Sequence, residues 1–163
     1  QLSLHVAAFY YDYESQQVFV NMTTGIAPYH VLKNAGDSTI YGLETELFYT
    51  PTSNIQMNLN VGYLPKADMG SYQDGEIIVN DNRLPFSSKW YVSGYFLYEA
   101  ELMNVMLTSQ LSFDYQSDYY FDQNENPYTE QTSFILFNGK ESTRGTEQET
   151  GQVGRGKIVD EIE

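Results

Sequence analysis

The stretch Asp37–Tyr63 alternates between apolar and polar residues on either side of a short polar break. The mainly apolar face carries Tyr41, Leu43, Thr45, Leu47 and Tyr49 before the break, and Ile55, Met57, Leu59, Val61 and Tyr63 after it. Successive side chains of a strand point to opposite faces, so a period of two predicts two strands, each with one apolar and one polar face. The break contains Pro51, which cannot donate to a ladder, and Asn54, which favours turns. The stretch is therefore predicted to be a long β-hairpin.

The same alternation recurs along the chain and predicts about six long strands in all. It is cleanest in Val105–Ser117, where every second residue from Val105 to Tyr115 lies on one face. The first strand is predicted as a single element, Leu2–Met22, with a split into two at Glu14–Gln16 as the alternative. Besides the hairpin, the predicted strands are Leu2–Met22, Trp90–Glu101, Val105–Ser117 and Thr132–Asn138.

The predicted connections alternate between long and short. The long ones are 23–36, 65–89 and 121–131, and the short ones are 51–54 and 101–104. In an antiparallel meander this order places all long loops at one end. Outer-membrane barrels have long extracellular loops and short periplasmic turns, and the strands exceed the ~5–6 residues common in soluble sheets. The predicted fold is all-β, an antiparallel meander forming a segment of a transmembrane barrel.

The composition agrees with a barrel and excludes several other classes. The 163 residues include 15 Tyr and 9 Phe, too many aromatic side chains for a disordered acidic chain. A net charge of −14 argues against nucleic acid as a partner, because phosphate binding needs Lys and Arg. The absence of Cys removes disulfides and thiolate sites. A mean hydropathy of −0.44 suits a barrel, because only every second strand residue faces lipid.

The two ends of the sequence carry separate expectations. No basic and apolar leader precedes the first predicted strand, so the chain is expected to be an internal or C-terminal piece of a longer protein. Residues 139–163 contain no aromatic residue and hold four of the eight basic residues. The predicted division is a barrel segment at 1–138 and a charged tail at 139–163 that is disordered or foreign to the barrel.

Candidate catalytic and metal-ligating residues are few. Ser3 and His5 share a strand face, but a nucleophile also needs an orienting group, and no third member is visible. His30 falls in a predicted loop. Glu44 and Glu46 share the polar face, where they are expected to meet water. The chain is predicted not to be an enzyme, with no catalytic residue, no metal site and no cofactor.

Two predicted loops are rich in acidic, amide and aromatic residues. Neither Asp74–Asn82 nor Asp118–Asn126 is predicted to form a calcium-binding EF-hand loop. Aromatic residues at strand ends suit the interfacial girdle of a barrel, whereas those in the loops could stack on a sugar or an aromatic siderophore. The predicted ligand-contact residues are Tyr72, Asp74, Tyr119, Tyr120, Phe121 and Tyr128.

Several of these segments together resemble the TonB-dependent receptors of the bacterial outer membrane. The central hairpin has an I-x-G-x-E-x-E-L core, a P-T-x-N-type turn and a returning L-N-x-G-Y strand. Further similarity lies in Asn82-Arg83-Leu84-Pro85 followed by Lys89-Trp90, and in Ser117–Asn126. The resemblance covers roughly residues 2–138. It implies a large barrel of about 22 strands in the cell outer membrane, and a lipid-facing position for the Trp90 side of its strand.

The resemblance also implies a function and its partners. Receptors of this family import a scarce nutrient, such as an iron–siderophore, a cobalamin or a saccharide. The implied partners are outer-membrane lipid, the remainder of the barrel, a plug domain, TonB acting through that plug, and the small-molecule nutrient. Plug and remaining barrel are absent from this sequence. Two alternatives stay open: a small self-contained porin or adhesin barrel, if Leu64–Lys89 or a split at Glu14–Gln16 adds strands, and a soluble sugar-binding β-domain.

Overall fold

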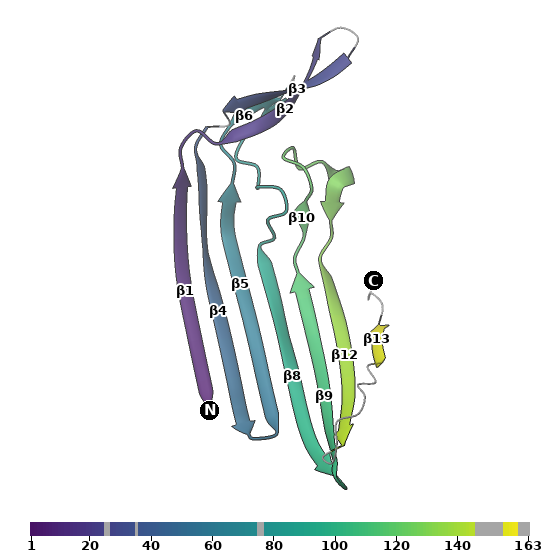
Figure 1. The fold of residues 1–163 in the computed structure, drawn as a ribbon. Coiled ribbons are helices and arrows are strands. Elements are labelled where there is room, and N and C mark those ends of the chain that lie inside the picture. Colours follow the sequence, from purple (N-terminus) through teal and green to yellow (C-terminus); the bar gives the residue numbers. More distant parts are fainter. Residues whose placement is uncertain (25–26, 35, 75–76, 146–154, 160–163) are drawn as a thin grey trace.

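The computed structural model describes residues 1–24, 27–34, 36–74, 77–145 and 155–159. Its main element is a seven-stranded antiparallel sheet (Figure 1). In spatial order its strands are β1 (Leu2–Tyr13), β4 (Ser38–Thr52), β5 (Ile55–Asp68), β8 (Trp90–Leu102), β9 (Val105–Gln116), β12 (Phe134–Gly145) and β13 (Arg155–Val159). The first six form an open meander, which confirms the predicted all-β fold.

The six strands of the meander are each 12 to 15 residues long. A tilted strand needs about 9–11 residues to cross a bilayer, so each is long enough to cross and to extend beyond it. Among the described residues, no helix is long and apolar enough to cross a membrane.

The strand register places all the predicted apolar faces on one side of the sheet. One row of directly paired residues crosses the whole meander: Leu4, Leu47, Leu59, Gly94, Phe113 and Phe137. The neighbouring row faces the other way: His5, Glu46, Asn60, Ser93, Asp114 and Leu136. Trp90 pairs with Tyr63, so its side of β8 belongs to the apolar face, as predicted. Below, these surfaces are called the apolar face and the polar face.

The apolar face is exposed rather than packed. Leu2, Leu4 and Val6 on β1, and Leu111 on β9, are among its solvent-exposed residues. Of the described residues, the buried hydrophobic ones are Ala67, Met69, Tyr72 and Val79, all at or beyond the end of β5. The sheet therefore has no core of its own and presents its apolar face to its surroundings.

The prediction of one strand over Leu2–Met22 is wrong, because the chain turns at Glu14–Ser15. Ser15 adopts a positive φ of 57°, and its amide donates to Asp37 Oδ1 at 3.1 Å. The chain then enters a separate hairpin, β2 (Gln17–Thr24) and β3 (Ala27–Asn34). The predicted loop 23–36 is thus mostly strand, and its residues 25, 26 and 35 lie outside the described residues.

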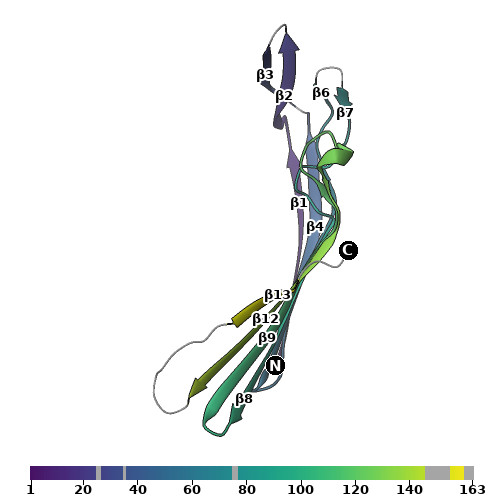
Figure 2. The same ribbon diagram turned by 90° about the vertical axis from the view of Figure 1, so that its right-hand side faces the viewer.

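The other long connections also contain short elements. A second hairpin, β6 (Tyr72–Asp74) and β7 (Ile77–Val79), lies between β5 and β8. Between β9 and β12 lie β10 (Tyr119–Tyr120), a 3-10 turn η1 (Pro127–Thr129) and β11 (Glu130–Gln131). Figure 2 shows both hairpins and the 3-10 turn at the same end of the sheet, called here the loop end. These added strands form separate sheets and do not lengthen the meander toward a small closed barrel.

The last strand of the meander differs from its predicted bounds. It was predicted as Thr132–Asn138, whereas β12 runs from Phe134 to Gly145 and pairs with β9 along its whole length. Part of the predicted tail is therefore strand, and β13 pairs with β12 between Phe137 and Glu141. Residues 146–154 and 160–163 of the predicted tail lie outside the described residues.

Candidate ligand-binding site

Two long connections are joined at the loop end by hydrogen bonds. The first runs from Met69 to Lys89 and the second from Ser117 to Ser133; they are called here the β5–β8 loop and the β9–β12 loop. The linking bonds are Asn82 Nδ2 to Gln123 O at 3.1 Å, Arg83 N to Glu125 Oε1 at 2.8 Å, and Phe86 N to Tyr120 O at 2.9 Å. The two loops thus form one structure above β8 and β9.

The β2–β3 hairpin belongs to the same assembly. Gln123 Nε2 of the β9–β12 loop donates to Phe19 O on β2 at 2.9 Å. Val31 of β3 and Leu84 pack against a small core, called here the loop core, made of Met69, Tyr72 and Val79. Three connections that are far apart in the sequence therefore hold one another in place, and this end of the molecule is an ordered platform.

Three aromatic rings gather on this platform and are called here the aromatic trio: Phe86, Tyr119 and Phe121. The ring centroids of Phe86 and Tyr119 are 6.3 Å apart, those of Phe86 and Phe121 5.5 Å, and those of Tyr119 and Phe121 5.3 Å. The side chain of Phe86 is 65% exposed. Aromatic rings prefer such tilted or edge-to-face arrangements at these separations, so the trio is a packed cluster that still faces solvent.

The Asp122 carboxylate organises the chain that follows the trio. Its Oδ1 accepts from the amides of Asn124 at 2.9 Å and Asn126 at 3.3 Å, and its Oδ2 accepts from Thr129 Oγ1 at 2.5 Å. Partial burial alone would raise the pKa of Asp122. The hydrogen bonds favour the charged form more strongly, so the pKa lies below its ordinary value. Asp122 therefore acts as an anionic cap that fixes the loop around η1.

Tyr120 and Tyr128 lie apart from the trio. Alternation along β10 turns Tyr120 away from Tyr119, and Tyr120 pairs with Glu130 of β11. The negative charge of Glu130, then burial, then the charges of Glu125 and Asp118 raise the pKa of Tyr120. Tyr128 lies on η1, and its side chain is 97% exposed.

The predicted ligand-contact residues are thus divided among several places. Tyr119 and Phe121 meet in the trio, whereas Tyr72 is only 7% exposed and belongs to the loop core. Asp74 ends β6, where it pairs with Ile77. Sequence reasoning missed Phe86, although a large apolar residue directly after Asn82–Pro85 in a polar loop was a signal that could have found it.

The polar face below the loops carries a hydrogen-bonded ladder. Asn58 Nδ2 donates to Glu46 Oε1 at 3.5 Å, Asn60 Nδ2 donates to Asn58 Oδ1 at 2.7 Å, and Asn60 also reaches Ser93 Oγ at 3.4 Å. The ladder crosses β4, β5 and β8. It gives the polar face a continuous surface of amide, hydroxyl and carboxylate groups, which suits contact with water and hydrated solutes.

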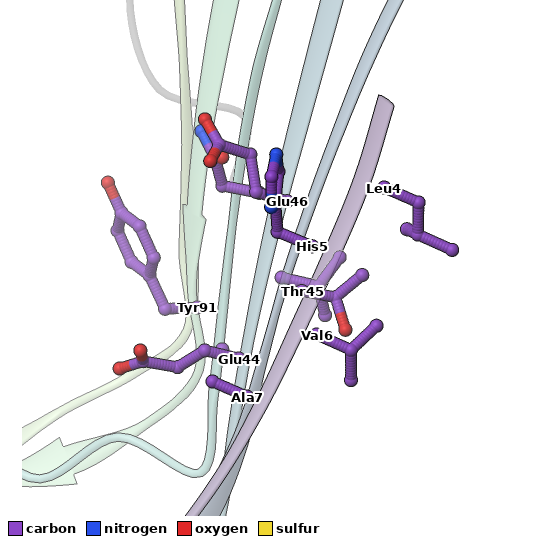
Figure 3. A pocket seen from close by; sticks show the side chains of 11 residues that line it. Leu4, His5, Val6, Ala7, Glu44, Thr45, Glu46 and Tyr91 are labelled. Carbon is purple, nitrogen blue, oxygen red and sulfur yellow. The ribbon is translucent and has the colours of Figure 1, made fainter. Parts of the chain in front are cut away.

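An open hollow of about 700 Å³ lies along β1, β4 and β5. Figure 3 shows His5, Glu44, Glu46 and Tyr91 on one side of the sheet, with Leu4 and Val6 on the other. Ser3 Oγ lies 3.0 Å from His5 Nε2. Within the part of the chain that the structure describes, no three His, Asp or Glu side chains form a group suited to a metal ion. The lining of the hollow is mixed, because it includes Leu4, Val6 and Val61 as well as charged side chains.

Comparison with known families decides between the classes of β-sheet protein. A family model described as TonB dependent receptor-like, beta-barrel, matches residues 1–140. The chain belongs to this family. Searches among curated proteins and among solved structures gave no significant match. TonB-dependent receptors are outer-membrane proteins that act as receptors and transporters, and they are not enzymes.

Membership in this family gives both faces of the sheet a physical meaning. In the barrel of a TonB-dependent receptor the outer face meets lipid, which accepts the exposed Leu, Val and aromatic residues of the apolar face. The polar face then lines the interior of the barrel. The family match ends at residue 140, within β12.

Proposed function

We propose that this chain supplies barrel wall and extracellular loops to an active transporter that imports a scarce nutrient across the outer membrane. The candidate nutrients are an iron–siderophore, a cobalamin and a saccharide. The observation that carries the proposal is the loop assembly. Three connections lock together at one end of a wall whose polar face continues directly below them. Such an arrangement captures a solute outside and leads it into the barrel.

The division of labour within the transporter follows from the resemblance described above. In this family the plug closes the barrel and its TonB box receives energy from the inner membrane. The residues of this chain therefore contribute capture and passage, and coupling lies with the plug. The asparagine ladder of Asn58 and Asn60 supports the passage role, because its amides can exchange hydrogen bonds with a hydrated solute.

The loop end can recognise a nutrient through stacking and hydrogen bonds. The exposed aromatic side chains Phe86, Phe121 and Tyr128 offer such contacts.

The proposal is tested by uptake in living cells. The full-length receptor that contains this chain is expressed in an outer-membrane host that lacks competing receptors. Uptake of radiolabelled ferric siderophores, cyanocobalamin and oligosaccharides is measured with and without the host tonB gene. Accumulation of one class that disappears on tonB deletion supports active transport. Uptake that is unchanged by the deletion, and that simply decreases as the solute becomes larger, would mean that the protein is a passive pore.

A further inference from the structure

The backbone at Phe86 adopts a conformation that is costly for a bulky residue. Its φ is +61°, in the left-handed region that glycine and asparagine tolerate and phenylalanine rarely enters. The conformation is fixed by Phe86 N donating to Tyr120 O at 2.9 Å and by Ser87 Oγ donating to Leu84 O at 2.5 Å. Strain of this kind persists where the surroundings impose it, and it concentrates at functional sites.

The strained backbone of Phe86 is not explained by burial of its side chain. A phenylalanine that served packing alone would be expected to lose most of its exposed surface, whereas the side chain of Phe86 remains 65% exposed beside Tyr119 and Phe121. The rings of Phe86 and Tyr119 meet that of Phe121 at interplanar angles of 70° and 78°. The trio therefore forms a corner of aromatic faces and edges that is open to the outside.

The charges of the loop that carries Tyr119 and Phe121 favour one kind of ligand. Ser117–Ser133 contains Asp118, Asp122, Glu125 and Glu130 and no Lys or Arg. Arg83 of the adjoining β5–β8 loop keeps its charge, and its guanidinium is held by donating to Leu64 O at 3.2 Å. Lys66 forms an ion pair with Asp68 at 3.6 Å. An anionic ligand would be repelled here, whereas carboxylates are good hydrogen-bond acceptors for neutral hydroxyl groups.

We propose that Phe86, Tyr119 and Phe121 form the stacking platform of a saccharide-binding site, with Phe86 as its most exposed ring. The proposal rests on the transport function above and narrows its substrate to a neutral sugar chain. A pyranose ring has an apolar C–H face that can lie on an aromatic ring, and hydroxyl groups at its rim that can donate to carboxylates of the β9–β12 loop. The rigid loop assembly holds the platform ready, which lowers the entropy lost on binding.

The platform is tested by direct binding to the full-length receptor, purified in detergent. The receptor is applied to an array of neutral oligosaccharides, and each hit is measured by titration calorimetry alongside a ferric catecholate, a ferric hydroxamate and cyanocobalamin. Phe86→Asn is the main variant, because Asn tolerates a positive φ and so removes the ring with little change of backbone. Phe121→Ala is the second variant. Phe19→Ala is the matched control, because it removes an exposed aromatic ring of β2 and keeps the backbone oxygen that accepts from Gln123 Nε2.

The expected result is a neutral oligosaccharide ligand whose affinity falls about fivefold to tenfold in Phe86→Asn and in Phe121→Ala, the size of one aromatic contact. The affinity should be unchanged in Phe19→Ala. Unchanged saccharide affinity in both Phe86→Asn and Phe121→Ala would show that the trio is not the binding site. Binding of a siderophore or cobalamin and of no saccharide would overturn the substrate class, yet leave active transport standing. If the proposed active transport is wrong, the uptake experiment described above will show this separately, as uptake that does not depend on tonB.

Discussion

Tyr63 and Trp90 stack across β5 and β8 with their ring centroids 4.1 Å apart. Tyr10 and Tyr41 stack on the same face, at 6.3 Å, near the loop ends of β1 and β4. Tyr98 lies eight residues from Trp90 along β8, toward the opposite end. Eight residues span about 27 Å of strand, or roughly 20 Å once the strand is tilted, close to the ~25 Å apolar band of such barrels. Aromatic side chains thus lie at both borders of the band that meets lipid.

Leu111 and Gln110 provide a direct test of the lipid-facing side. Leu111 pairs with Phe96 and Gly139 on the apolar face, and Gln110 pairs with Leu97 and Lys140 on the polar face. Leu111→Arg in the full-length receptor should lower the free energy of unfolding in lipid vesicles by about 2–4 kcal/mol if it lies near the bilayer midplane. Gln110→Arg should change it little. Equal losses from the two variants would contradict the assignment of the faces.

Ile78 and Met103 test which end of the sheet lies outside the cell. Ile78 lies in the β6–β7 hairpin and is 75% exposed, and Met103 lies in the tight turn between β8 and β9 and is 99% exposed. The chain has no cysteine, so single substitutions give unambiguous probes if the rest of the receptor is also made cysteine-free. An impermeant thiol reagent added to whole cells should label Ile78→Cys and leave Met103→Cys unlabelled until the cells are opened. The reverse pattern would invert the topology.

Asp122 should make its loop sensitive to acid. Its pKa lies below the ordinary value of 3.8, so the charged form stabilises the folded loop. That contribution is complete above the ordinary pKa and is lost as the pH falls through the lowered value. Asp122→Asn should lower the protection of amides in residues 118–131 against hydrogen exchange at neutral pH. The further loss of protection that acid causes in the unmodified protein, measured relative to the intrinsic exchange rate at each pH, should be absent from this variant. Asp118→Asn is the control, and an equal effect there would show that overall charge, rather than the cap, controls the loop.

Gly42 should tolerate no side chain. A Cβ at this position would lie 2.6 Å from Tyr63 O and 2.7 Å from Phe9 Cζ, whereas one at Gly62 would have 3.7 Å to its nearest neighbour. Gly42→Ala should therefore destabilise the barrel by about 1–3 kcal/mol through overpacking, and Gly62→Ala should be mild. Thermal unfolding of the full-length receptor, followed by heat-modifiable mobility on gels, measures both. Similar melting temperatures for the two variants would show that Phe9 moves aside at little cost.

The strand faces could be predicted because a period of two in the sequence corresponds to two sides of a sheet. The register then had to bring Leu47 beside Leu59 and Glu46 beside Asn60, since a slip of one residue would expose polar groups to lipid. Gly42 shows what the alternation in the sequence does not predict. Its sequence neighbours placed it on the polar face, but only the structure shows the register shift beside it and the ring of Phe9 above it.

The loops were harder to predict because tertiary contacts decide their structure. The turn at Ser15 depends on Asp37, which is distant in the sequence, and Phe86 reaches Tyr119 and Phe121 only when two loops meet. β12 continues past Asn138 because β9 offers pairing partners as far as Val105. The division into 1–138 and 139–163 stays a prediction, and limited proteolysis of the full-length receptor in detergent would test it.

The chain by itself should not remain soluble. Within the described residues, β1 pairs only with β4, so its outer edge offers a long row of free backbone groups next to exposed Leu2, Leu4 and Val6. Such an edge templates aggregation, and soluble monomers rarely expose a continuous apolar face that runs across a whole sheet. Residues 1–163, expressed alone without detergent, should therefore aggregate and should bind no nutrient. Size-exclusion chromatography with amide hydrogen exchange measures this. A soluble monomer with strongly protected amides in β4, β5 and β9 would instead mean that the sheet buries its apolar face on its own.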